Sequence, residues 1–153
     1  MSQIVTRTAA IRLNGAPDQV FPLFTALGEY HWIPGWSPTL IYPPSGEPMT
    51  HNVFVTQHGD QQTIWVAVDY DLATQHVEYV NVTPGLTSVH LDIQCRAADG
   101  GTEAQISHTV IALAEAGYAE VEHSTEAAFA ERMQQWQHAI NDFLAHHALI
   151  PQH

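Results

Sequence analysis

The stretch VHLDIQCRAADGGTEAQISHTV, residues 89–110, decides the fold of this chain. Apolar and polar residues alternate on both sides of the turn signal Asp99-Gly100-Gly101, which is typical of two antiparallel strands joined by a hairpin. One face would carry the apolar residues Val89, Leu91, Ile93, Ile106 and Val110, and the other His90, Asp92, Gln94, Arg96, Glu103, Gln105, Ser107 and Thr109. This alternation predicts a sheet with one buried face and one face in water.

The pattern extends toward the N-terminus. Runs of β-forming residues between about residues 38 and 112 alternate with turn signals at residues 43–46, 58–60, 71–75 and 84–85. Such short connections join antiparallel neighbours, so these runs predict a meander. Before them, residues 5–13 alternate as well and predict a first strand with one buried face.

Two helical regions flank the predicted meander. Ala16-Pro17-Asp18 places proline at a first helical position and starts a helix. Pro22 lies inside that helix and is expected to kink it. The apolar stripe of this helix is Val20, Phe21, Phe24 and Leu27, and a short helical turn follows before Pro34. Residues 124–147 predict one long helix. Its apolar stripe is Phe129, Met133, Trp136, Ile140, Phe143 and Leu144.

These elements predict an α+β fold class. We expect a curved antiparallel sheet of six to seven strands wrapped around a long C-terminal helix, with two short helices after the first strand. A length of 153 residues suits one domain, so residues 1–153 are interpreted as a single domain. A content of 45% hydrophobic and 13% charged residues is that of a globular protein.

This order of elements resembles the START-like, or SRPBCC, superfamily. The motifs that carry the resemblance are Ala16-Pro17-Asp18-Gln19-Val20-Phe21, Trp32-Ile33-Pro34-Gly35-Trp36 and the terminal segment 133–140. The resemblance covers essentially the whole chain and implies a helix-grip fold with a cavity between the sheet and the long helix. Members of the superfamily include lipid and hormone carriers, polyketide cyclases and co-chaperones, so the resemblance leaves the function open.

Composition excludes several kinds of partner and chemistry. Four arginines, no lysine and sixteen carboxylates give a formal net charge of -12, so we expect no binding to nucleic acid and no stable insertion into a membrane. The absence of lysine removes Schiff-base chemistry and the usual phosphate-binding lysine. Residues 1–7 do not resemble a signal peptide, and a single cysteine fits a reducing compartment, so a cytoplasmic protein is expected.

Metal ions and cofactors are not expected either. Cys95 is the sole cysteine and continues an apolar alternation, which predicts a small buried residue. Eleven histidines are present, but none lies in a His-Glu-x-x-His pattern or beside a cysteine. His146-His147 near the chain end can bind metal adventitiously.

Reflecting each predicted hairpin about its turn brings residues of four strands into one row. The row is Ala67, Tyr79, Leu91 and His108. Tyr79, Asn81 and His108 are polar exceptions on the apolar face, and Asp69 is expected nearer a rim. The predicted ligand-binding wall is Trp65, Ala67, Tyr79, Asn81, Leu91 and His108 from the sheet, and Phe129, Met133 and Trp136 from the helix. Arg132 lies at the edge of the helical stripe, where it can meet a ligand carboxylate or carbonyl, or a neighbouring acid.

Three functions stay open from the sequence. The first is binding of a small hydrophobic or aromatic ligand, as in a carrier or sensor. The second is an enzyme of the cyclase, dehydratase or hydrolase type, with His108 as general base or acid and Tyr79 or Asp69 assisting. The third is a co-chaperone-like interaction module, which a large exposed apolar patch would favour. Equally open is a filled core in which Tyr79 and His108 bond to each other, to water or to the backbone.

Overall fold

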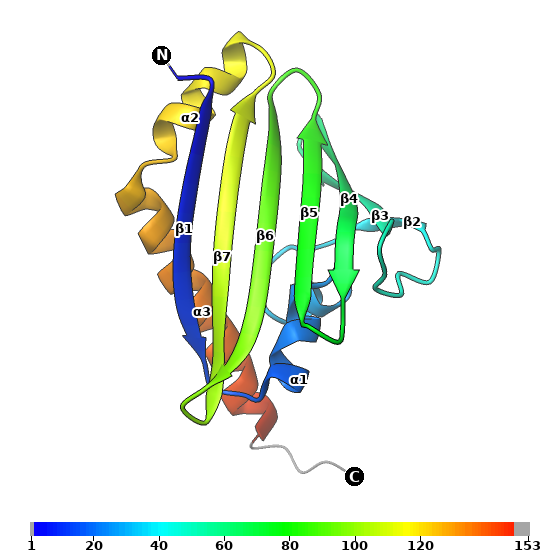
Figure 1. The fold of residues 1–153 in the computed structure, drawn as a ribbon. Helices are drawn as coiled ribbons and strands as arrows, with labels where there is room; N and C mark the ends of the chain where they lie inside the picture. Colours follow the sequence, from blue (N-terminus) through cyan, green and yellow to red (C-terminus); the bar gives the residue numbers. More distant parts are fainter. Residues whose placement is uncertain (1, 149–153) are drawn as a thin grey trace.

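Within residues 2–148, which the computed structural model describes, seven antiparallel strands and one long helix form the framework of the protein (Figure 1). The strands are β1 (Ile4–Leu13), β2 (Thr39–Tyr42), β3 (Val53–His58), β4 (Gln61–Asp71), β5 (His76–Thr83), β6 (Thr87–Ala98) and β7 (Gly101–Ala112). The α-helices are α1 (Pro17–Val20), α2 (Tyr118–His123) and α3 (Glu126–Ala148), and the 3₁₀ helices are η1 (Phe21–Phe24), η2 (Gly28–His31) and η3 (Glu115–Gly117).

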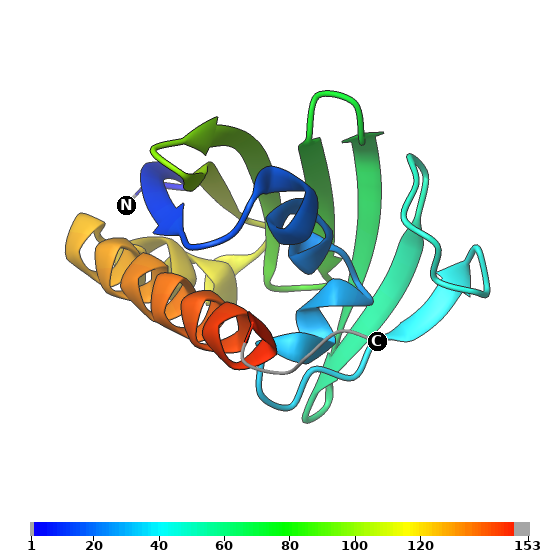
Figure 2. The same cartoon turned by 90° about the horizontal axis from the view of Figure 1, so that it is seen from below.

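The strands lie in the order β1-β7-β6-β5-β4-β3-β2, so the first strand pairs with the last one. The sheet is strongly curved, and α3 together with the helical segment between β1 and β2 covers its concave side (Figure 2). This arrangement confirms the predicted α+β architecture, a curved sheet wrapped around a long C-terminal helix.

The strand register agrees with the row predicted from the turns. Ala67 lies opposite Tyr79, Tyr79 opposite Leu91, and Leu91 opposite His108. Glycines with positive φ stand in the tight connections at residues 85 and 100, where that backbone conformation favours glycine. Because such short turns fix the pairing of their strands, reflection about them is enough to find the opposing residues.

The helix predicted from Ala16 is divided at Pro22. Residues 17–20 form α1, and η1 begins at Phe21 with Pro22 in its first turn, where a missing backbone N–H costs nothing. Phe21 and Phe24 are fully buried, as expected from the stripe. Leu27, which lies beyond the end of η1, is 38% exposed, so the predicted apolar stripe ends before it.

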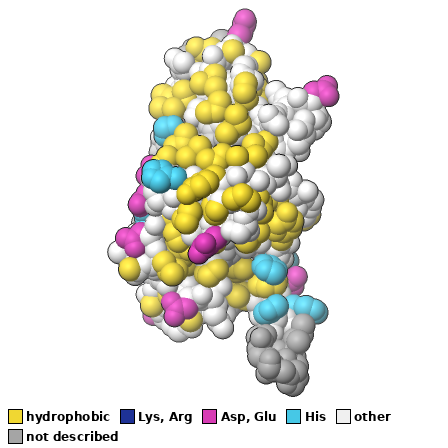
Figure 3. Space-filling model, turned by 90° about the vertical axis from the view of Figure 1, so that its right-hand side faces the viewer, with side chains coloured by type: hydrophobic (Ala, Val, Ile, Leu, Met, Phe, Trp, Pro, Cys, Tyr) yellow, Lys and Arg dark blue, Asp and Glu magenta, His cyan; other side chains and the backbone are white. Residues whose placement is uncertain are grey.

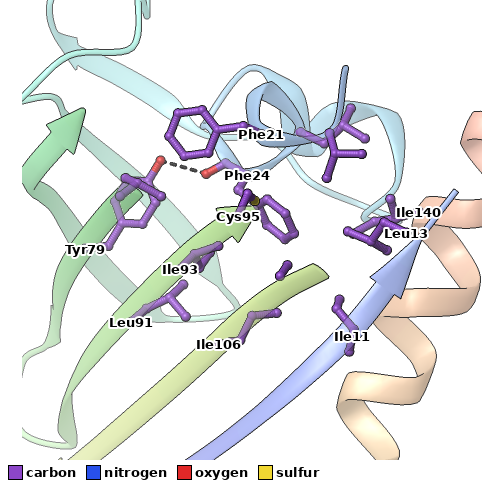
Figure 4. Close-up of a cluster of buried hydrophobic side chains, with 14 of the residues drawn as sticks. Ile11, Leu13, Phe21, Phe24, Tyr79, Leu91, Ile93, Cys95, Ile106 and Ile140 are labelled. Atoms are coloured by element: carbon purple, nitrogen blue, oxygen red, sulfur yellow. Dashed lines mark hydrogen bonds between the residues drawn. The ribbon is translucent and has the colours of Figure 1, made fainter. Parts of the chain in front are cut away.

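The packed core fills one end of the concave side, and Figure 4 shows its centre. Phe21 and Phe24 lie over Ile93 and Ile106, and α3 contributes Ile140. Cys95 is buried there at 2% exposure, as predicted, and burial raises the pKa of its thiol to about 12. The thiol is therefore a small apolar group in this core rather than a nucleophile.

Apolar side chains also gather on the side that carries the edge strand β2 (Figure 3). Ile41 and Tyr42 of this strand are about half exposed.

In the described part of the chain, no helix has both the length and the apolar character needed to cross a membrane.

Candidate functional site

A cavity of about 240 Å³ lies between the first half of β6, the second half of β7 and the N-terminal half of α3. The sheet lines it with Trp65, Asn81, Thr87, Val89, Leu91, His108 and Val110. The remaining walls are Glu29, Ile33, Trp36, Glu120, Ser124, Arg132 and Trp136. The aromatic core fills the other end of the concave side, so the cavity is confined to this end.

Three tryptophans form the apolar walls of the cavity. The rings of Trp36 and Trp65 meet edge to face with centroids 6.3 Å apart. Their indole N–H groups are already used, since Trp36 Nε1 donates to the Ala26 carbonyl at 2.7 Å and Trp65 Nε1 to Thr56 Oγ1 at 3.0 Å. These two rings are thus held in place by the protein and offer apolar surface to a ligand. Trp136 lines the wall formed by α3.

His108 lines this cavity and has a ring nitrogen without a partner among the described residues. Its side chain is buried at 8% exposure, and its ring packs against Phe129 and Trp136 at centroid distances of 5.2 and 5.7 Å. Among the side-chain nitrogen and oxygen atoms of the described residues that water cannot reach at all, His108 Nε2 is the one without a hydrogen-bond partner. Burial, and secondarily the positive charge of Arg132, lowers the pKa of His108 to about 4, so the ring is neutral at pH 7.

Glu29 adds a buried carboxyl group to the same cavity. The residue is 8% exposed, and its carboxyl group makes no hydrogen bond or ion pair with any described residue. Burial raises its pKa to about 8, so the group is mostly a neutral carboxylic acid at pH 7 and can donate a hydrogen bond. Gly28 positions it, because a Cβ at residue 28 would lie 1.8 Å from the Pro22 carbonyl oxygen.

Arg132 stands at the exposed rim of the cavity, beside Ser124 and Glu120. The sequence left open a salt bridge to a neighbouring acid, but within residues 2–148 Arg132 has no ion pair and no side-chain hydrogen bond. Arg7 of β1 lies close by and donates from Nε to the Ser124 carbonyl at 3.0 Å. Two guanidinium groups are thus found at this end of the cavity.

Five of the predicted wall residues line the cavity, namely Trp65, Asn81, Leu91, His108 and Trp136. The others lie in or beside the packed core. Ala67, Tyr79 and Met133 are buried among apolar side chains, and Phe129 lines a small hollow of about 10 Å³ behind His108. Sequence reasoning did not find Glu29, Trp36 or the two rim residues Glu120 and Ser124.

Tyr79 is held by the protein itself. Its hydroxyl group donates to the Phe24 carbonyl at 2.8 Å, as the dashed line in Figure 4 shows. Burial, and secondarily the charges of Glu29 and Tyr70, raises the pKa of Tyr79 well above its ordinary value. Tyr79 therefore bonds to the backbone within a filled core, which is one of the alternatives that the sequence left open. His108 Nε2, by contrast, has no hydrogen-bond partner among the described residues.

Asp69 lies on the other face of the sheet, contrary to its expected place near the rim of the apolar face. The register shifts between Ala67 and Asp69, and this β-bulge turns Asp69 outward. There His76 joins two carboxylates, with Nδ1 2.7 Å from Asp69 and Nε2 2.9 Å from Asp92. Within the described residues, no three His, Cys, Asp or Glu side chains gather in a group that could hold a metal ion.

Solved structures resemble this fold over nearly its full length. Ara h 8.0201 has 18% identity, covers 86% of this chain and 96% of its own, and has a TM-score of 0.61. Major latex-like protein 151 from Panax ginseng has 12% identity, coverage of 97% and 100%, and a TM-score of 0.65. Truncated norcoclaurine synthase from Thalictrum flavum has 11% identity, coverage of 99% of both chains and a TM-score of 0.62. No protein-family model and no curated protein matches the sequence itself.

Proposed function

Because the chain has the helix-grip fold of the START-like superfamily, we propose that it binds a small hydrophobic or aromatic molecule in the cavity between the sheet and α3. The observation that carries the proposal is a cavity walled by three tryptophans and bordered by His108, whose buried Nε2 has no partner among the described residues. A buried nitrogen without a partner is costly, and a bound molecule can remove that cost.

The composition of the cavity supports an amphipathic guest. Small-molecule sites are mostly apolar with a few placed polar groups, and here His108, Glu29 and Asn81 interrupt the apolar walls. The volume of about 240 Å³ is slightly below the range of about 300–1,000 Å³ that is typical of drug-sized ligands. We therefore expect a compact ligand, such as a small aromatic compound or a short acyl chain.

A fluorescence titration with the neutral dye N-phenylnaphthylamine tests this proposal. The dye should bind with a saturable increase in emission, and Val89→Phe should weaken binding about tenfold by filling the cavity. Val82→Phe is the matched control, since Val82 lies on the neighbouring strand and is 36% exposed on the outer face. Absence of saturable binding, or equal loss in both variants, would refute the proposal.

An enzyme of the cyclase, dehydratase or hydrolase type is the second candidate, and one observation favours it. Glu29 and His108 line the same cavity as a protonated acid and an unprotonated base, which are the forms that general acid and general base catalysis need. A point mutant of norcoclaurine synthase, whose solved structure matches this fold with a TM-score of 0.64, is in complex with a transition state analogue. Fold likeness alone does not assign chemistry.

Native mass spectrometry of co-purified ligands separates the two candidates. A carrier holds the same molecule in the wild type and in Glu29→Gln. An enzyme that uses Glu29 as an acid accumulates its substrate in Glu29→Gln and not in the wild type. A ligand of the same mass in both proteins would therefore count against the enzyme.

A further inference from the structure

The four arginines fall into two classes by their partners. Arg12 forms an ion pair with Asp99 at 3.2 Å, and Arg96 forms one with Glu103. Within residues 2–148, Arg7 and Arg132 have no carboxylate partner. Carboxylates outnumber arginines by sixteen to four in this chain, so an unpaired guanidinium group is not explained by a shortage of acids.

Both unpaired arginines lie at the same end of the cavity. Arg132 lines the main cavity, and Arg7 and Arg132 together line the small hollow that adjoins it. His108 borders both spaces, is buried at 8% exposure and leaves Nε2 without a partner. The hydrogen bond of Arg7 Nε to Ser124 occupies one donor and leaves the terminal nitrogens of its guanidinium group available.

We propose that the ligand carries an anionic head group, which Arg132 binds at the α2–α3 end of the cavity with Arg7 adjacent, while the apolar body lies among Trp36, Trp65 and Trp136. This proposal rests on the proposed binding function and names its ligand class, an apolar molecule with one negatively charged end. Guanidinium groups suit this role because their planar donors match carboxylate and phosphate oxygens.

The surrounding charges support a single negative group. Glu120 also lines the rim, but it forms no ion pair with an arginine in the described chain. Its charge opposes an anion, whereas two guanidinium charges favour one, so the local balance is positive in a protein of net charge -12. His108 borders both spaces and is neutral at pH 7, so it adds no charge to this balance.

Competition for the neutral dye measures this preference directly. Naphthoate and naphthamide have the same ring system and nearly the same shape, but at about pH 7 only naphthoate is charged. Each is titrated against bound N-phenylnaphthylamine. Naphthoate should displace the dye from the wild type at about tenfold lower concentration than naphthamide.

Arg132→Gln should remove this preference, because it should weaken naphthoate about tenfold and weaken the neutral naphthamide and dye much less. Arg132→Lys should retain part of it, because the charge remains. Arg96→Gln is the matched control, since it removes the same charge from an exposed position whose partner is Glu103. Arg132 is exposed, so its replacement leaves the core intact, and a thermal unfolding curve checks this.

The outcomes distinguish a failure of the anionic head group proposal from a failure of the proposed binding function. A preference for naphthoate or for naphthyl phosphate that Arg132→Gln abolishes and Arg96→Gln preserves supports the proposal, and the preferred anion identifies the head group. Binding of the dye without any preference for an anion overturns this proposal alone. An equal effect of Arg132→Gln and Arg96→Gln also overturns it, since long-range charge then explains the preference. No binding of any probe overturns both proposals.

Discussion

Glu29 and His108 line one cavity from η2 and β7, and burial shifts the pKa of the acid up to about 8 and the pKa of the base down to about 4. Both groups are therefore mainly uncharged at pH 7, the acid as a donor and the imidazole as a donor and acceptor. A cavity of this kind can hold polar atoms of a ligand without placing two charges in an apolar environment.

The Glu29 carboxyl group should make stability fall as the pH rises. Its pKa is about 8 in the folded protein and near 4.5 in the unfolded chain, so between these values the unfolded state loses a proton that the folded state keeps. Glu29→Gln should thus raise the free energy of unfolding at about pH 8 by on the order of 1–3 kcal/mol and change it little near pH 4.5.

Urea unfolding at both pH values checks this expectation. The control is Glu131→Gln, which removes an exposed carboxylate from α3. An equal change in stability of Glu29→Gln at the two pH values would contradict a buried, protonated Glu29.

His108→Leu should leave the protein as stable as the wild type or up to about 2 kcal/mol more stable at pH 7, because it removes a buried nitrogen that has no partner. Below pH 6.5 the unfolded chain binds a proton that the folded protein resists down to about pH 4, so wild-type stability falls across this window. The variant should lack that part of the slope. Chemical unfolding from about pH 4 to 7 measures it, and a loss of 1 kcal/mol or more at about pH 7 would indicate a structural histidine.

Tyr79→Phe should separate structure from binding. The substitution removes the hydrogen bond to Phe24 and leaves that carbonyl without its partner, which costs about 1–2 kcal/mol. The affinity for N-phenylnaphthylamine should stay unchanged, because Tyr79 does not line the cavity. Thermal unfolding and dye titration on the same sample give both values, with Tyr30→Phe, at 50% exposure, as the control. Weaker dye binding by Tyr79→Phe would contradict this and show that Tyr79 contributes to the ligand site.

His76, on the outer face of the sheet, should change stability with pH in the opposite direction to His108. Burial by itself lowers the pKa of His76, but hydrogen bonds and charges from Asp92 and Asp69 outweigh it and raise the pKa. A raised pKa contributes stability that is fully present below about pH 6.5 and is lost as the pH rises through the folded value. Since both carboxylates are about half exposed, His76→Gln should cost about 0.5–1 kcal/mol near pH 5.5 and less near pH 9. A cost independent of pH would refute this.

The sequence predicted the sheet register because tight turns and strict alternation leave little freedom. Ala67, Tyr79, Leu91 and His108 stand opposite one another as expected. The same reasoning misplaced Asp69, because a β-bulge inserts one residue into β4 and reverses the face of the residues after it. The alternation of residues 65–71 shows no sign of that insertion, so only the pairing with β5 reveals it.

The sequence pattern could not predict Glu29 as a cavity residue, for a different reason. It lies in a 3₁₀ turn without apolar periodicity, and an ionisable side chain is normally assigned to the surface. Its burial depends on Gly28, which lets η2 approach the backbone of Pro22 more closely than any side chain would allow. The long-helix stripe, by contrast, was predicted correctly, but its periodicity cannot tell a packed residue such as Met133 from a cavity wall such as Trp136.

Intermolecular nuclear Overhauser effects between N-phenylnaphthylamine and the protein's methyl groups test the central claim most directly, because they arise only at short distances and distinguish the two faces of the sheet. A ligand in the cavity should give contacts from its aromatic protons to the methyl groups of Val89, Leu91 and Val110, which line it. Ile64 and Val82, on the same sheet but exposed, should give none. Contacts to Ile64 and Val82, or a bound dye without contacts to the cavity methyl groups, would contradict a ligand site between the sheet and α3.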